Sequence, residues 1–231
     1  MAFRPEDLGR LREVFAGKGL LVSGGLSSPV EQFCCYSVYN FLKTSKNEKV
    51  IWVAADDSYE KVQKIFSDYG YNLKPYLDRF LFIDLISLKS GAEVKENERV
   101  KYVQDPGNLT ELAMAVSEHM ESGKVGMIVM YPMNSLLLYN ELPRALEFAR
   151  IMVARAFEKK FVFVGAAIEG EHDEKAHIGI RLAMDALLKV EENHLHVVGA
   201  KDMDSFSYSF EKDGLKAERA KEKFDRAKML G

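Results

Sequence analysis

The residues best suited to chemistry lie in a glycine-rich turn at 24–31. Gly24 and Gly25 follow an apolar stretch, and Ser27 and Ser28 precede a segment with helical spacing. A strand, a glycine-rich turn and a helix in this order are the setting of the phosphate-binding motif G-x-x-x-x-G-K-[ST], in which main-chain N–H groups surround an anion. The N–H groups of the turn and the dipole of the following helix therefore predict a weak anion site.

The side chains that this motif needs are absent. Its second glycine falls on Pro29, its lysine on Val30 and its hydroxyl residue on Glu31. One like charge at ~4 Å from a phosphate costs about 4 kcal/mol at an effective dielectric near 20. With the missing lysine, the loss approaches the roughly 8 kcal/mol that holds a micromolar ligand. The alternative interpretation is a tight strand-to-helix turn with Pro29 at the first helical position.

Carboxylates at the ends of predicted strands form the second candidate group. Asp56 and Asp57 follow one strand-like segment, and Glu169 follows another. With Glu31, these acids could bind a divalent metal or act as general bases. The alternative for Asp57 is a helix cap, with Glu60 at the capping-box position.

Histidines give a weaker signal for a metal site. One acidic segment contains several potential ligands, namely Glu169, Glu171, His172, Asp173 and His177. Their spacing matches no established metal motif, so the segment is interpreted as a solvated loop. His194 and His196 share one face of a predicted strand and could form a weak metal pair, and the alternative is an ordinary surface hairpin.

Alternating strand-like and helix-like segments must position these residues. Apolar runs predict strands at 19–23, 49–55, 79–85, 125–131 and 160–167. Helical spacing predicts helices at 30–43, 58–69, 108–121, 142–158 and 174–184. Two more strands, near 186–191 and 194–199, pair as a hairpin across Glu192 and Asn193. The sequence thus predicts an α/β fold with a mostly parallel central sheet, flanking helices and a C-terminal antiparallel hairpin.

The organisation predicted from the chain is one domain over 1–231. No Pro/Gly/Ser-rich linker and no internal repeat divides it. The charged stretch 89–101 is expected to be a loop or an insertion. Alternating charges in the last part of the chain predict a charged C-terminal helix over 212–231.

Composition narrows the function classes. The 231 residues carry a net charge of −3, which disfavours general nucleic-acid binding. The N-terminus has no apolar signal region, and the longest apolar runs are too short to cross a bilayer. Cys34 and Cys35 are adjacent, which makes them poor disulfide partners and indicates a cytoplasmic protein with two small buried hydrophobes. Scarce Gln and abundant Lys and Glu indicate a thermophilic source.

Several stretches together carry a family resemblance. They are residues 21–25 (LVSGG), 49–58 (KVIWVAADDS), 135–140 (SLLLYN) and 169–174 (EGEHDE). In this order and spacing the chain resembles archaeal-type proteins of the KaiC-like branch of RecA-superfamily ATPases, over nearly its whole length. The resemblance implies a RecA-like P-loop fold and assembly into rings or filaments.

The departures from that family fall on its catalytic positions. The phosphate lysine corresponds to Val30, the Mg²⁺ hydroxyl to Glu31, and the acid that ends the fourth strand to Tyr131. Of the family's catalytic positions, only the pair after the second strand is still acidic. This pair is Asp56 and Asp57, where the family has water-activating glutamates. The resemblance therefore implies degenerate Walker A and Walker B motifs.

The sequence leads to three hypotheses. The first is a non-catalytic pseudo-ATPase that serves as a binding or regulatory module, with a homo-oligomer or another protein as partner. It expects no enzyme activity and no cofactor, ATP included. The second is nucleotide binding without hydrolysis. The third is a repurposed metal-dependent enzyme that uses Glu31, Asp56, Asp57 and Glu169.

Overall fold

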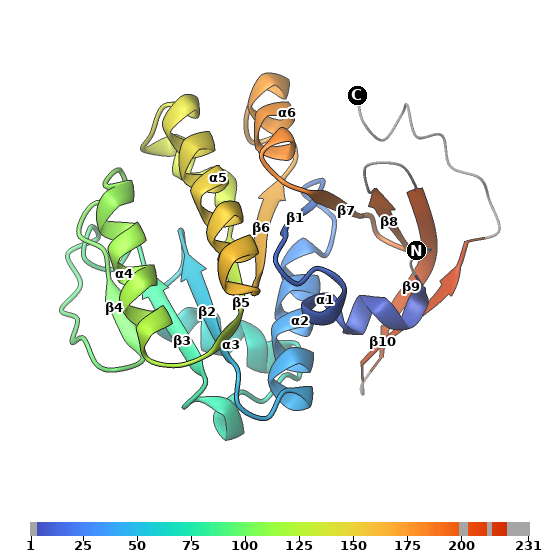
Figure 1. The fold of residues 1–231 in the computed structure, drawn as a ribbon, viewed down its shortest axis with the longest axis horizontal. Helices are drawn as coiled ribbons and strands as arrows, with labels where there is room; N and C mark the ends of the chain where they lie inside the picture. The colour runs from blue at the N-terminus through green and yellow to red at the C-terminus, as the bar shows by residue number, and fades with distance from the viewer. Residues whose placement is uncertain (1–3, 199–202, 212–213, 221–231) are drawn as a thin grey trace.

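The fold is a mixed sheet between two layers of helices (Figure 1). The computed structural model describes residues 4–198, 203–211 and 214–220. Across these residues runs a ten-stranded sheet in the order β10-β9-β8-β7-β1-β6-β5-β2-β3-β4. Neighbours from β7 to β4 pair in parallel, and neighbours from β7 to β10 pair antiparallel. The predicted parallel sheet with a C-terminal antiparallel extension is confirmed.

The strands and helices largely match the predicted segments. The strands are β1 (Gly19–Gly24), β2 (Lys49–Ala54), β3 (Phe80–Asp84), β4 (Val100–Tyr102), β5 (Val125–Tyr131), β6 (Val162–Ile168), β7 (Ala186–Val190), β8 (His194–Val198), β9 (Met203–Glu211) and β10 (Gly214–Arg219). The α-helices are α1 (Leu11–Val14), α2 (Val30–Thr44), α3 (Tyr59–Asp68), α4 (Leu109–Glu121), α5 (Leu142–Lys159) and α6 (Glu174–Leu182). The described residues also form three short 3₁₀ helices, η1 (Pro5–Gly9), η2 (Lys74–Tyr76) and η3 (Met133–Leu138).

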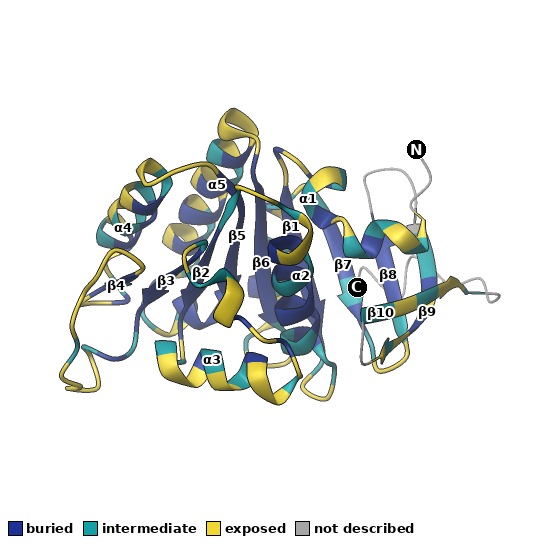
Figure 2. Cartoon of the chain, turned by 90° about the horizontal axis from the view of Figure 1, so that it is seen from below, coloured by how far each residue is buried: buried dark blue, intermediate teal, exposed yellow. Residues whose placement is uncertain are grey.

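Each face of the sheet has its own hydrophobic core. The α2 and α3 side buries Leu20 and Val22 of β1, and the α4, α5 and α6 side buries Leu21 of the same strand. Figure 2 shows the buried strands between α3 and α5. Because side chains alternate along a strand, β1 contributes to both cores. Because both faces of the central strands are buried, their sequences are continuous apolar runs rather than alternating patterns.

The C-terminal part of the chain is a strand where a helix was predicted. Gly214–Arg219 forms β10, which pairs antiparallel with β9. Leu215 and Ala217 pack against the core, whereas Lys216 and Glu218 are exposed. This period of two is typical of a half-buried strand, and the alternating charges concealed it. The rest of the predicted helix, residues 212–213 and 221–231, lies outside the described residues, apart from Ala220.

Two further strands were not predicted. Strand β9 pairs with β8 and β10 and carries the buried Phe206 and Tyr208. Strand β4 lies at the end of the charged stretch predicted as a loop and pairs in parallel with β3. It is short, and of its side chains only that of Val100 is buried, so the sequence has too little periodicity to reveal it.

A buried histidine joins α4 to the sheet. His119 is 2% exposed, and its Nε2 lies 3.1 Å from the carbonyl oxygen of Phe82 in β3. Burial lowers the pKa of His119 below its ordinary value of 6.5. A group with a lowered folded-state pKa stabilises the fold above its unfolded pKa, and this contribution is lost as the pH falls through the folded one.

We therefore predict that the free energy of unfolding decreases between about pH 7 and about pH 5.5 as His119 must accept a proton. His119→Gln should show a smaller decrease over the same range. Urea unfolding of both proteins at several pH values measures the difference. His194→Gln serves as a control at a half-buried histidine of β8. Equal pH slopes for the wild-type protein and His119→Gln would contradict the assignment.

Candidate functional site

The 24–31 turn begins where three strands meet. The Glu169 N–H, after β6, donates to the Gly24 carbonyl over 2.8 Å. A Cβ atom on Gly24 would lie 2.3 Å from the carbonyl oxygen of Val190 in β7 and 2.7 Å from Cβ of Ser28. Real Cβ atoms essentially never come that close to backbone, so this position requires glycine. By contrast, a Cβ on Gly25 would meet only Ser28 Oγ, at 3.9 Å.

The turn closes on itself through its own amides. The Ser28 N–H donates to the Gly25 carbonyl at 2.9 Å, and the Val30 N–H donates to the Ser28 carbonyl at 2.8 Å. Pro29 has no N–H, and it caps α2 rather than occupying the predicted first helical position, which belongs to Val30. An anion site needs amides directed at the ligand. The predicted site at Gly24, Gly25, Ser27 and Ser28 therefore retains fewer such donors than its glycines suggest.

The two residues after Pro29 have found protein partners. Val30 is fully buried in the core of the α2 face. Glu31, in the first turn of α2, accepts a hydrogen bond of 2.9 Å from the Tyr69 hydroxyl. Burial, and then the charge of Glu31, raise the pKa of the Tyr69 and Tyr131 hydroxyls well above their ordinary value. Glu31 thus serves as a hydrogen-bond acceptor among half-buried tyrosines.

The acids after β2 also have partners. The Ser135 hydroxyl donates to Asp56 over 2.6 Å. Asp57 forms an ion pair with Lys61, one helical turn on. Asp57 raises the pKa of Lys61, with smaller effects from Glu31 and Asp56, so the three predicted acids share one edge of the sheet around this ammonium group.

The predicted capping box of Asp57 and Glu60 is wrong. Ser58 is the N-cap of α3, and its hydroxyl accepts a hydrogen bond of 3.3 Å from the Lys61 N–H. The helix begins at Tyr59, which makes Lys61, not Glu60, the third helical residue. Asp57 thus lies before the cap, where its carboxylate reaches the Lys61 side chain instead of a backbone amide.

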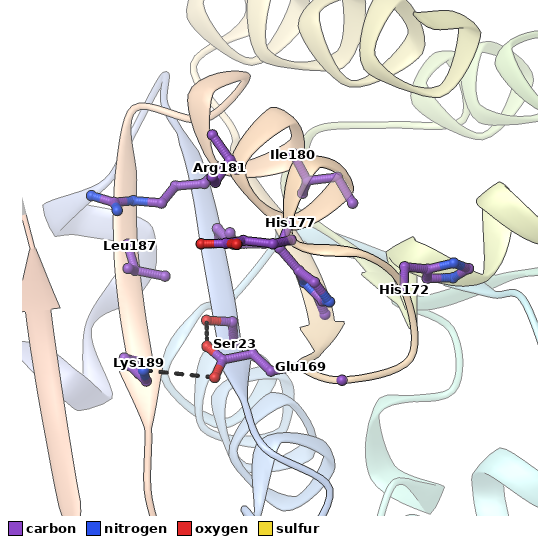
Figure 3. A pocket seen from close by; sticks show the side chains of 13 residues that line it. Ser23, Glu169, His172, His177, Ile180, Arg181, Leu187 and Lys189 are labelled. Atoms are coloured by element: carbon purple, nitrogen blue, oxygen red, sulfur yellow. Dashed lines mark hydrogen bonds and ion pairs between the residues drawn. The ribbon is translucent and has the colours of Figure 1, made fainter. Parts of the chain in front are cut away.

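Glu169 belongs to a different face of the sheet. Its carboxylate accepts a hydrogen bond of 3.1 Å from the Ser23 hydroxyl and lies 3.6 Å from the Lys189 ammonium (Figure 3). Ser23 alternates with Val22 along β1, so its side chain is on the α6 side, opposite α2. The structure brings Glu31, Asp56 and Asp57 together and leaves Glu169 apart.

This arrangement offers few side chains that could bind a metal ion. Within the described ranges, no group of three or more His, Cys, Asp and Glu residues is arranged to hold a metal ion. The acids at the strand ends are each engaged by a hydroxyl or an ammonium group. His194 and His196 have stacked rings, but His196 is buried and its Nδ1 lies 2.9 Å from the Ser205 hydroxyl. The predicted surface hairpin therefore has one buried histidine.

The cysteines behave as predicted small hydrophobes. Cys34 and Cys35 are free and buried in α2. Burial raises the pKa of both thiols, so the reactive thiolate is disfavoured.

Sequence reasoning missed the partners of the acids rather than the acids themselves. Tyr69, Ser135 and Lys189 are the side chains that engage Glu31, Asp56 and Glu169. Each comes from a segment distant in sequence. Lys61 was the one partner with a local signal, since it follows Asp57 at the i, i+4 spacing of helical ion pairs.

Comparison with known proteins supports the fold. No protein-family model matches this sequence, and no curated protein matches it. The chain is similar to the crystal structure of an uncharacterised protein from Pyrococcus horikoshii in complex with an unknown peptide, with a TM-score of 0.68 and 17% identity over 93% of this chain and 97% of that one. It is also similar to a KaiC-like protein from Pyrococcus horikoshii OT3, with a TM-score of 0.60 and 12% identity over 88% of this chain and 90% of that one.

These similarities show a KaiC/RecA-like fold, and identities this low show the fold alone. In the part of the chain that the structure describes, no helix has the length and apolar character to span a membrane.

We predict that Gly24→Ala lowers the free energy of unfolding by about 3 kcal/mol or more, because the added methyl group meets the Val190 carbonyl. Gly25→Ala, one residue on, has room for its methyl group and should change stability by about 0.5 kcal/mol or less. Urea unfolding of both variants provides the comparison. Similar stabilities would show that the junction of the three strands relaxes.

A double-mutant cycle tests the Glu31 hydrogen bond. Tyr69→Phe should lower stability by about 1 kcal/mol in the wild-type background, because a carboxylate loses its donor. In a Glu31→Ala background the same change should have a much smaller effect. Tyr76→Phe removes a hydroxyl at the other end of the same aromatic cluster and is the matched control. Additive effects of the two substitutions would rule out this bond as a stabilising interaction.

Proposed function

We propose that this chain is a non-catalytic RecA/KaiC-like pseudo-ATPase that acts as a binding or regulatory module. The proposal rests on the two residues that occupy the positions where ATPases of this fold have their phosphate lysine and their Mg²⁺-binding hydroxyl. Val30 is fully buried, and Glu31 is hydrogen-bonded to Tyr69. We interpret the 24–31 turn as a degenerate Walker A motif and Tyr131 as the replacement of the Walker B acid.

Electrostatics supports the absence of ATP hydrolysis. A nucleotide in the usual position would bring its phosphates toward the Glu31 carboxylate with no lysine to neutralise them. One such like-charge contact at ~4 Å costs about 4 kcal/mol at an effective dielectric near 20. The Ser28 and Val30 amides already donate within the turn. Binding would therefore need to break bonds that the folded chain has made.

Without ATP hydrolysis, the role that remains for such a domain is to bind a macromolecular partner. Helix α6 exposes Ile178 and Leu182, one turn apart, with 43% and 75% of their surfaces accessible. Exposed apolar pairs of this kind are suited to a protein contact. The similar Pyrococcus horikoshii protein was crystallised with an unknown peptide, which motivates a peptide segment or a second copy of this chain as partner.

The proposal predicts no enzyme-like turnover of ATP. Purified protein with Mg²⁺ should hydrolyse ATP far more slowly than the rate on the order of 1 per second that enzymes reach. Thermal unfolding with ATP, ADP or GTP and Mg²⁺ should be unchanged. A ligand at about 100 times its dissociation constant would add roughly 2.7 kcal/mol, several degrees for a domain of this size.

The outcomes separate the alternatives. Turnover at an enzyme-like rate would sink the pseudo-ATPase proposal. A thermal shift without turnover would favour nucleotide binding without hydrolysis. A shift with Mg²⁺ or Mn²⁺ alone that Asp56→Asn abolishes would favour the metal-dependent enzyme. An active RecA-type ATPase assayed in parallel is the positive control.

A further inference from the structure

A cavity lies on the α6 side of the sheet (Figure 3). It has a volume of about 290 Å³ and is bounded by α6, by the segment that leads from β6 into α6, and by side chains of β1, β6 and β7. Apolar side chains form much of its wall, namely Leu21, Ala167, Ile180 and Leu187. Ligand pockets begin near ~300 Å³ and are mostly apolar with a few placed polar groups, so the cavity fits a small molecule.

The polar groups of the cavity are not balanced between donors and acceptors. Both oxygens of Glu169 are engaged, one by the Ser23 hydroxyl and the other by the Lys189 ammonium. Lys189 carries three N–H donors, and its contact with Glu169 is long, at 3.6 Å. The Glu169 carboxylate is therefore satisfied, while the Lys189 ammonium beside it retains donor capacity.

His177 supplies a second polar group, and its Nε2 donates in the tautomer that carries the proton there. Its side chain points from α6 into the cavity in Figure 3, and His172, before the same helix, also lines the cavity. The Nε2 atom of His177 is buried, and no described group forms a hydrogen bond with it. A buried polar nitrogen without a partner costs about 1–3 kcal/mol, so it favours a ligand that can complete the bond.

We propose that this cavity binds a small organic monocarboxylate. The apolar body of the ligand rests on Leu21, Ala167 and Leu187, and its carboxylate accepts hydrogen bonds from His177 Nε2 and the Lys189 ammonium. This inference is independent of the pseudo-ATPase proposal, because the cavity lies on the opposite face of β1 from Glu31 and Tyr69.

Charge selects a monoanion over other ligands. Charged groups of both signs line the cavity, namely the carboxylates of Glu169 and Glu174 and the cations of Lys189 and Arg181. A dianionic phosphate would meet the carboxylates with twice the repulsion of a carboxylate ligand and would offer no apolar body to the wall. An ammonium ligand would compete with Lys189 for Glu169 and would leave His177 beside a second cation. A monocarboxylate with an apolar chain suits both the donors and the wall.

Isothermal titration calorimetry with matched six-carbon probes tests the proposal. Hexanoate, hexanamide and hexylammonium share one apolar chain and differ in the head group. We expect hexanoate to bind with a dissociation constant of about 1 mM or tighter, and hexanamide to bind about tenfold more weakly or not at all. Hexylammonium and inorganic phosphate should show no saturable binding. Equal or tighter binding of the amide, the ammonium or the phosphate would overturn the proposal.

Two substitutions locate the ligand. His177→Phe keeps a ring of similar size without its nitrogens, and Lys189→Met keeps the chain without its charge. Each should weaken hexanoate about tenfold, and His194→Gln, outside the cavity, should leave it unchanged. Far-UV circular dichroism and urea unfolding establish that each variant is folded, and either variant alone suffices. Unchanged hexanoate affinity in a folded His177→Phe or Lys189→Met protein, or no binding by the wild type, would refute the assignment.

Discussion

Strand β1 is the constraint on which the rest of the structure depends. Parallel strands pair with both of its edges, β6 on one side and β7 on the other, and its residues are buried throughout. At its end Gly24 lies so near the Val190 carbonyl that no side chain fits. The chain must therefore leave the sheet in a tight turn. That turn sets where α2 begins and which side chains gather around the strand ends.

The alternation of side chains along β1 separates two environments. Leu20 and Val22 face α2 and α3, where Glu31 meets Tyr69. Leu21 and Ser23 lie on the other side, where the cavity beneath α6 contains Glu169 and His177. The two faces of β1 thus belong to different environments. One is rich in carboxylates and tyrosines, and the other borders a cavity with hydrogen-bond donors. Glu169 connects them, because its N–H holds Gly24 while its carboxylate faces the cavity.

The three acids that gather at the ends of β1 and β2 each have a partner within the protein. Glu31, Asp56 and Asp57 would repel one another if they stood alone, but each is engaged by a hydroxyl or an ammonium group of the protein. Tyr131 is partly buried beneath this edge of the sheet, and its ring lies 6.1 Å from that of Trp52, which adds aromatic packing where a charged group would be costly. The side chains at this edge therefore satisfy one another's charges and hydrogen bonds.

Aromatic packing also joins the antiparallel extension to the parallel sheet. Tyr36 of α2 contacts Phe210 of β9 edge-on, and Tyr208 contacts the same ring. The 3₁₀ helix η1 lies beside β10 as well, so the two ends of the described chain meet on this side of α2. The extension therefore continues the core of the α2 face.

The sequence by itself determined the parallel sheet, the helices between its strands and the position of the 24–31 turn. These elements bury continuous apolar runs or one helical face, and such patterns can be recognised from neighbouring residues in the sequence. It also located the acids at the strand ends, since those follow each run directly. Tertiary structure alone decided that 214–219 is a strand, because its half-buried pattern gains meaning only against β9 and the aromatic residues beside α2. It decided as well that Glu31 bonds Tyr69, that Glu169 turns away from the other acids, and that a cavity opens beside His177. A side chain's partner depends on which distant segments the sheet brings together, and no local spacing carries that information.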